Sequence, residues 1–177
     1  MNPWFIATER FDSSDGDNWT RFVAWAGLPQ LQELVSLDPM LCPTLLGETK
    51  DEYWPHIVNE DFHLNFFVDF EFLKRAVAAK ERKNMLCVFR NPTIDPIAPG
   101  FARFKFLGYD VVDIQNSVSA LTNCGGFPKS FSAMELSSAG LLPDRMRACN
   151  VREDLRRNYP EDPHANCNYW AIFRAEP

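Results

Sequence analysis

Cys124 is the side chain in this sequence best placed to act as a nucleophile, because two glycines follow it in the run NCGG (residues 123–126). A thiolate beside glycine N–H groups can attack an acyl carbon and stabilise the resulting oxyanion. His164 is the available base, and Asp162 or Asn166 could orient its ring. The pattern matches no protease signature, and a cysteine before two glycines is also typical of a strand that ends in a turn with positive φ. A thiol-dependent hydrolase or transferase is therefore an alternative hypothesis.

The histidines and cysteines of this chain show little of the spacing that is typical of metal sites. A structural zinc site needs four convergent ligands, usually with one pair at short spacing. His164 and Cys167 form one H-x-x-C pair, His56 and His63 are too far apart for a standard helical pair, and the sequence has no C-x-x-C. We therefore expect no metal and no other cofactor.

Paired carboxylates occur at 51–52, 60–61 and 69–71. General acid–base hydrolysis needs two carboxyl groups held about 5–10 Å apart in a cleft. Neighbouring acids on one segment point apart and face water, so these pairs favour a solvated surface.

Arginines cluster in residues 145–157, which could indicate contacts to phosphates. Acidic residues alternate with them at helical i,i+3 and i,i+4 spacing, as between Glu153 and both Arg156 and Arg157, which predicts a self-paired face. The chain also lacks a glycine-rich phosphate loop and has a pI near 5.1. We expect no nucleic-acid binding.

Negative charge is concentrated in the first part of the chain. Residues 1–70 hold 12 acidic and 3 basic residues, although the net charge of the whole chain is only −6. An acidic half attracts basic partners and repels phosphate backbones, but it can also serve only to keep the protein soluble.

Composition indicates a globular protein with a substantial core. Among the 177 residues, 46% are hydrophobic and 14% are aromatic. The opening residues have no basic region of a signal peptide, and no window is apolar enough to cross a bilayer. An odd count of 5 cysteines without short-range pairing favours reduced thiols and a cytoplasmic location. We expect no membrane partner.

Apolar periodicity predicts the helices that must position these residues. A stripe at helical spacing covers residues 18–27, with Asp15 or Asp17 as the N-cap. The clearest helical pattern spans residues 66–84, with basic residues towards its end. A last helix begins at Pro143 and stops before Pro160.

Shorter signals predict the remaining elements. Residues 85–90 are expected to form a central strand, residues 101–114 one or two strands with a bulge at Gly108, and residues 167–174 a terminal strand. Ser132 and Glu135 have capping-box spacing for a short helix that ends at Gly140. Helices and strands mix without a βαβ rhythm, which predicts a single α+β domain over residues 1–177 with a largely antiparallel sheet.

Eight stretches together resemble a family of small bacterial cytosolic proteins associated with the immunity proteins of contact-dependent and other polymorphic toxin systems. The resemblance spans most of the chain and is carried by residues 35–43, 53–62, 66–73, 84–92, 108–113, 119–128, 135–142 and 164–174. It implies a non-enzymatic protein that binds a cognate toxin, in many cases a nuclease, and masks its basic active site. An interaction module unrelated to toxins is a further alternative.

The acidic segment (residues 48–61) has the composition for such a contact, because acids alternate with aromatic residues that suit interface anchors. The predicted partner-binding residues are Glu48, Asp51, Glu52, Tyr53, Trp54, Glu60 and Asp61. The opposing interpretation places Trp54 and Phe62 in the core and leaves the acids to solvate a loop.

Overall fold

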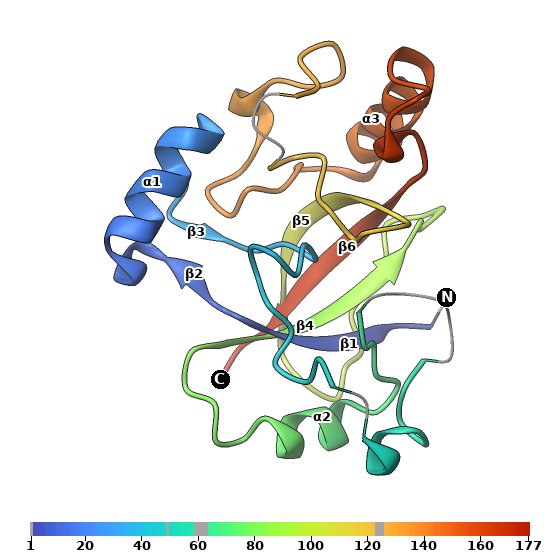
Figure 1. Ribbon diagram of the computed structural model, residues 1–177. Coiled ribbons are helices and arrows are strands. Elements are labelled where there is room, and N and C mark those ends of the chain that lie inside the picture. Colours follow the sequence, from blue (N-terminus) through green and yellow to red (C-terminus); the bar gives the residue numbers. More distant parts are fainter. Residues whose placement is uncertain (1, 49, 59–63, 123–125) are drawn as a thin grey trace.

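A four-stranded antiparallel sheet forms the centre of the molecule in the computed structural model (Figure 1). The structure describes residues 2–48, 50–58, 64–122 and 126–177. The sheet contains β1 (Trp4–Glu9), β4 (Lys83–Arg90), β5 (Phe104–Asp113) and β6 (Cys167–Ala175) in the order β1-β4-β6-β5. All three pairings are antiparallel, which confirms the predicted α+β fold.

The two predicted apolar strands occupy the centre of this sheet. Strands β4 and β6 each have neighbours on both sides, and Leu86, Cys87, Ala171 and Ile172 have no exposed surface. A strand that is covered on both faces needs a continuous apolar run, as residues 85–90 and 169–173 supply. Strand β5 is a single strand, and its register shifts between Phe106 and Gly108, so the predicted bulge is confirmed.

Helix α1 (Asp17–Ala26) lies on a second, two-stranded sheet of β2 (Phe11–Asp12) and β3 (Glu33–Leu34), beside the main sheet in Figure 1. The helix lies where the apolar stripe predicts. The predicted caps were wrong: Gly16 is the N-cap of α1, and Asp15 instead completes the capping box of the preceding 3₁₀ turn η1 (Ser13–Asp15).

Helix α2 covers only Phe70–Ala76, so the predicted helix over residues 66–84 was wrong at both ends. At the start, the backbone of Phe67 exchanges hydrogen bonds with Phe5 of β1, which holds the chain extended. Asp69 then caps the helix by accepting a hydrogen bond from the N–H of Phe72. At the end, Lys83 already belongs to β4, and its Nζ donates to the carbonyl of Val77.

Helix α3 (Arg145–Asn158) packs on β5 and β6. Its N-cap is Asp144, so Pro143 precedes the helix and does not open its first turn. The capping box of Ser132 and Glu135 is present, but it begins the 3₁₀ turn η3 (Ala133–Glu135), and the predicted continuation to Gly140 was wrong.

The second 3₁₀ turn, η2 (Asp51–Tyr53), carries part of the acidic segment, and η4 (Pro163–Ala165) precedes β6. Two apolar clusters pack around the main sheet, one containing Phe5, Tyr109 and Ala171 and the other containing Ile6 and Ile172. Because strand neighbours point to opposite faces, Phe5 and Ile6 enter different clusters.

Candidate functional site

The described part of the acidic segment presents three carboxylates and one tryptophan to solvent. Asp51 and Glu52 begin η2 and are exposed, Glu48 is exposed just before it, and 61% of the surface of Trp54 is exposed. Within the ranges that the structure describes, no ion pair holds Glu48, Asp51 or Glu52. The interpretation that Trp54 is a core residue was therefore wrong.

Tyr53 has the opposite orientation and is 4% exposed. Its ring packs edge-on against Phe67 and Phe72, with centroids 5.9 and 5.8 Å away. The Nζ of Lys50 lies 5.8 Å from the centre of the same ring. The prediction that Tyr53 is an interface anchor was wrong, because the turn of η2 directs this side chain into the core.

Glu60 and Asp61, the other two predicted partner-binding acids, lie outside the described residues, as does Phe62. Beside the described part of the segment is a cavity of about 440 Å³, whose charged lining residues are Glu48, Lys50 and Lys80. The charge of the cavity lining is therefore mixed, and Glu48 is its one acidic residue.

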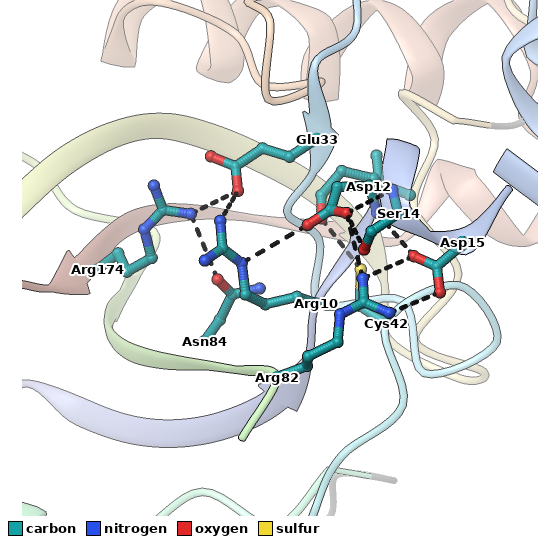
Figure 2. Close-up of polar contacts among 10 residues, drawn as sticks. Arg10, Asp12, Ser14, Asp15, Glu33, Cys42, Arg82, Asn84 and Arg174 are labelled. Atoms are coloured by element: carbon teal, nitrogen blue, oxygen red, sulfur yellow. Dashed lines mark hydrogen bonds and ion pairs between the residues drawn. The ribbon is translucent and has the colours of Figure 1, made fainter. Parts of the chain in front are cut away.

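Other acids of the N-terminal half are bound by arginines from within the molecule (Figure 2). Arg82 donates to Asp15 Oδ1 from Nη1 at 2.9 Å and to Asp12 Oδ1 from Nη2 at 3.2 Å. Hydrogen bonds from Ser14, with the charges of Arg82 and Arg10, hold the pKa of Asp12 below its ordinary value. These two carboxylates are therefore not free to attract a partner.

Glu33 is held in the same way by two arginines. Its Oε2 accepts hydrogen bonds from Arg174 Nη1 at 2.6 Å and from Arg10 Nη2 at 3.1 Å, and Arg174 also donates to Asn84. Burial alone would raise the pKa of Glu33, but the hydrogen bond and charge of Arg174, aided by Arg10, hold that pKa below its ordinary value. The network joins β3 to β6 and to the chain after β1 (Figure 2).

Asp38, from residues 1–70, and Asp110 are buried and have no basic partner among the described residues. Asp110 is 1% exposed, and its Oδ2 accepts hydrogen bonds from Ser36 Oγ at 2.7 Å and from Leu37 N at 2.9 Å. Asp38 is 3% exposed and accepts from the N–H of Met40. Burial raises the pKa of both carboxyl groups. The negative charge of residues 1–70 is therefore not displayed uniformly, and Glu48, Asp51 and Glu52 stand apart from the paired and buried acids.

The ring of His164, the base of the thiol-chemistry hypothesis, is held by Asp162. Its Nδ1 lies 2.8 Å from Asp162 Oδ1, and its ring packs against Phe127 at 4.9 Å between centroids. The residue is 6% exposed, and its Nε2 is buried with no hydrogen-bond partner in the described chain. Of the two residues predicted to orient this ring, Asp162 and Asn166, Asp162 is therefore the one that contacts it. Cys124 lies outside the described residues.

Three of the other thiols are buried and hold their protons tightly. Burial raises the pKa of Cys42 and of Cys87 to about 12, and it raises the pKa of Cys167 as well. A protonated, covered thiol is a poor nucleophile and a poor metal ligand. Among the described residues, no group of three or more His, Cys, Asp or Glu side chains is arranged to hold a metal ion.

The arginines of α3 are largely paired with acids, as the spacing indicates. Glu153 accepts from Arg152 at 2.9 Å and from Arg156 at 3.4 Å, whereas Arg157 pairs with Asp154 at 3.4 Å. Arg147 is bound to Glu135 through two nitrogens. Such a face offers little free positive charge to a phosphate backbone.

A pocket beside β5 was not predicted from the sequence. It has a volume of about 330 Å³ and is lined by Asp95, Pro96, Phe106, Tyr109, Pro143, Asp144 and Phe173. These residues come from the proline-rich loop of residues 91–100, from β5 and β6, and from the two residues before α3. No pattern within a short stretch of sequence predicts this pocket, because its lining residues lie far apart in the sequence.

No protein-family model, curated protein or solved structure matches the chain. The family resemblance of the sequence therefore remains a prediction. Over the described ranges, no helix is long and apolar enough to cross a membrane.

Proposed function

We propose that this protein binds a basic partner protein through the exposed face of the acidic segment, and that the partner is a bacterial toxin that it neutralises as an immunity protein. The observation that carries the proposal is the contrast between two sets of acids. Asp12, Asp15 and Glu33 are bound by arginines of the molecule itself. Glu48, Asp51 and Glu52 are exposed beside the equally exposed Trp54.

Charge and shape would contribute separately to this contact. Exposed, unpaired carboxylates speed the encounter with a positive cleft and align the two proteins. Trp54 supplies a large aromatic surface, and tryptophan is enriched among the residues that dominate binding energy. For a nuclease toxin, the same carboxylates would compete with the phosphates of the substrate.

The test requires the toxin candidate encoded directly upstream of this chain's gene. We expect it to bind the purified protein and to lose affinity by about tenfold or more when Glu48→Lys, Asp51→Lys and Glu52→Lys are combined, because like charges then meet. Trp54→Ala should weaken binding separately. Calorimetric titration gives the affinity, and thermal unfolding should stay nearly unchanged because all four side chains are exposed.

A matched control reverses three exposed acids elsewhere: Asp17→Lys, Glu71→Lys and Glu161→Lys. This variant has the same net charge as the first, so a specific contact predicts retained affinity. If both variants lost the same affinity, the net charge of the protein would explain the loss, and the assigned contact surface would be contradicted. A partner that binds but has no toxicity would support an interaction module unrelated to toxins.

Thiol chemistry at Cys124 is the second candidate function, and the Asp162–His164 pair favours it. A histidine whose Nδ1 is held by a carboxylate and whose Nε2 is free has the arrangement of a general base. The measurement is alkylation of Cys124 by iodoacetamide across pH, read by mass spectrometry. An activated thiol has an apparent pKa below about 8.5, and His164→Gln should raise it. A Cys124 that stays unmodified, or whose pH profile ignores His164→Gln, excludes this candidate.

A further inference from the structure

The two outer strands of the main sheet differ in how their free edges are covered. The edge of β1 is paired along most of its length: Phe5 exchanges backbone hydrogen bonds of 2.8 Å with Phe67 in both directions, and Leu45 N donates to Ala7 O at 2.9 Å. Glu9 N donates to Pro43 O at 2.8 Å. Loops therefore protect this edge, as exposed strand edges generally require.

Strand β5 is covered only over its second half. Tyr109 N donates to Leu142 O at 2.9 Å, Leu142 N donates to Tyr109 O at 3.0 Å, and Ala120 N donates to Val111 O at 2.8 Å. Asp144, two residues beyond Leu142, is the N-cap of α3, so this pairing ends there. In the described chain, β6 is the one segment that pairs with residues 104–107, so their outer edge is open.

The unpredicted pocket adjoins this open edge. Its aromatic wall is formed by Phe106, Tyr109 and Phe173, with ring centroids 5.4 Å apart for Phe106–Tyr109 and 5.1 Å apart for Phe106–Phe173. Asp95 and Asp144 contribute carboxylates to the lining. The hydroxyl of Tyr109 donates to Asp95 Oδ1 at 3.2 Å, which fixes this carboxylate beside the rings.

The two carboxylates that line the pocket are not fully neutralised by neighbouring basic residues. Arg145 Nε lies 3.5 Å from Asp95 Oδ1 and partly neutralises it. Asp144 uses Oδ1 to accept from the N–H of Arg147, and it has no ion pair in the described residues. Aromatic faces attract cations, and carboxylates add to that attraction. The pocket therefore suits a guanidinium or ammonium group on an apolar chain.

We propose that the open edge of β5 and this pocket together form a binding site, the β5 edge site, for an extended segment of a partner protein. The segment runs antiparallel to β5, in line with residues 141–142, and pairs with residues 104–107. Its residue opposite Phe106 is arginine or lysine. Directly opposed side chains in antiparallel strands lie on the same face about 5 Å apart, so this basic side chain reaches the pocket.

A second copy of this chain fits the site less well. On the face that bears Phe106, the open stretch of β5 offers only Phe104 and Phe106, and neither is basic. On the other face it offers Lys105, which is exposed and would oppose its equivalent in a pairing centred on that residue. The site is also separate from the acidic segment, so the proposal stands apart from the proposed function.

The test uses the full chain, labelled with ¹⁵N, and the capped peptide TVTRTVT as the probe. We expect saturable shifts in the amide signals of residues 104–107 and Tyr109, with millimolar or tighter affinity. Norleucine in place of the arginine should weaken binding about three- to tenfold, and glutamate should weaken it more. Binding of all three peptides with equal affinity, or shifts confined to other residues, would overturn the proposal.

Two controls separate backbone pairing from charge attraction. A peptide N-methylated at every second residue loses the N–H donors along one of its two edges. Methylation of the edge that faces β5 should abolish binding, and methylation of the opposite edge should leave binding intact. The variant Asp95→Asn with Asp144→Asn should lose affinity several-fold while keeping an Asn cap on α3. Asp17→Asn with Glu71→Gln serves as its matched control. Binding by both methylated peptides, or equal affinity of the two variants, would count against the site, and dimerisation seen by ultracentrifugation would instead assign the edge to a second copy.

Discussion

The acidic residues of this protein differ in behaviour because their neighbours differ. Glu33 is half-buried and bound by two arginines, Asp110 is buried with neutral donors only, and Asp51 is exposed. These environments give the same chemical group three roles: an ion pair between segments, a hydrogen-bond acceptor in the core and a free surface charge. The first two roles have opposite pH dependence.

Replacing Glu33 tests the ion pair. Because the folded pKa of Glu33 is lowered, its stabilising contribution is present above the unfolded pKa and is lost as the pH falls through the folded pKa. We expect Glu33→Gln to lower the free energy of unfolding by about 1–3 kcal/mol at pH 7, because two arginines lose their negatively charged partner and face a neutral amide. Urea unfolding at a series of pH values should show the difference shrinking below about pH 4. A constant difference would contradict the assignment.

Asp110 should show the reverse trend. Burial raises the folded pKa of Asp110 above the ordinary 3.8, so protonation of this carboxyl group favours the folded state. The contribution of Asp110 to stability therefore falls as the pH rises from 3.8 through the folded pKa. Asp110→Asn removes this pH dependence, but it leaves a donor such as Leu37 N without an acceptor. The variant should therefore lose about 1–3 kcal/mol near pH 4 and less at higher pH. Thermal unfolding of both proteins across this range provides the comparison, with Asp17→Asn as a surface control.

At the level of single elements, β5 depends on a glycine at its bulge. Gly108 has a φ of +140°, and a Cβ there would lie 2.7 Å from Leu141 Cβ and from Leu142 O. The segment that covers the second half of β5 therefore packs directly onto the glycine backbone. This close approach separates the covered part of the edge from the open part at residues 104–107.

Gly108→Ala should accordingly destabilise the fold by about 3 kcal/mol or more, from overpacking and from a strained φ together. Gly100→Ala is the matched control, because its φ is not positive and a Cβ there meets nothing within 4 Å. Urea unfolding curves of the two variants measure the difference. Equal stabilities would mean that the covering segment can move away from β5.

For the molecule as a whole, the sheet joins segments from both halves of the chain. Strand β4 lies between β1 and β6, and Glu33 of β3 is bound to Arg174 of β6. No part of the sheet can therefore unfold without exposing the apolar surface of the other parts. This connectivity also brings the acidic N-terminal half into contact with its neutralising arginines.

Unfolding should therefore be a single cooperative transition. Tryptophan fluorescence reports all 5 tryptophans, including Trp19 on α1 and Trp170 on β6, whereas far-UV circular dichroism reports the backbone. We expect the two denaturation curves to coincide, and hydrogen exchange to be slowest in β4 and β6. Separate transitions would show that α1 with β2 and β3 is an independent unit.

The sequence by itself determined the features that arise from local physics. The apolar runs of β4 and β6, the stripe of α1, the bulge at Gly108 and the capping box of Ser132 each depend on neighbouring residues, and the structure confirms them. The i,i+3 pair of Glu153 and Arg156 belongs to the same group.

Tertiary structure alone decided which acids are free, which aromatic residues are exposed and where the β5 edge site lies. Phe67 could not remain helical because β1 takes its backbone hydrogen bonds. Tyr53 and Trp54 are adjacent and similar in composition, yet packing buries one and exposes the other. Glu33 and Arg174 form an ion pair although 141 positions separate them in the sequence. Such contacts depend on which surfaces the sheet brings together, and no pattern within a short stretch of sequence contains that information.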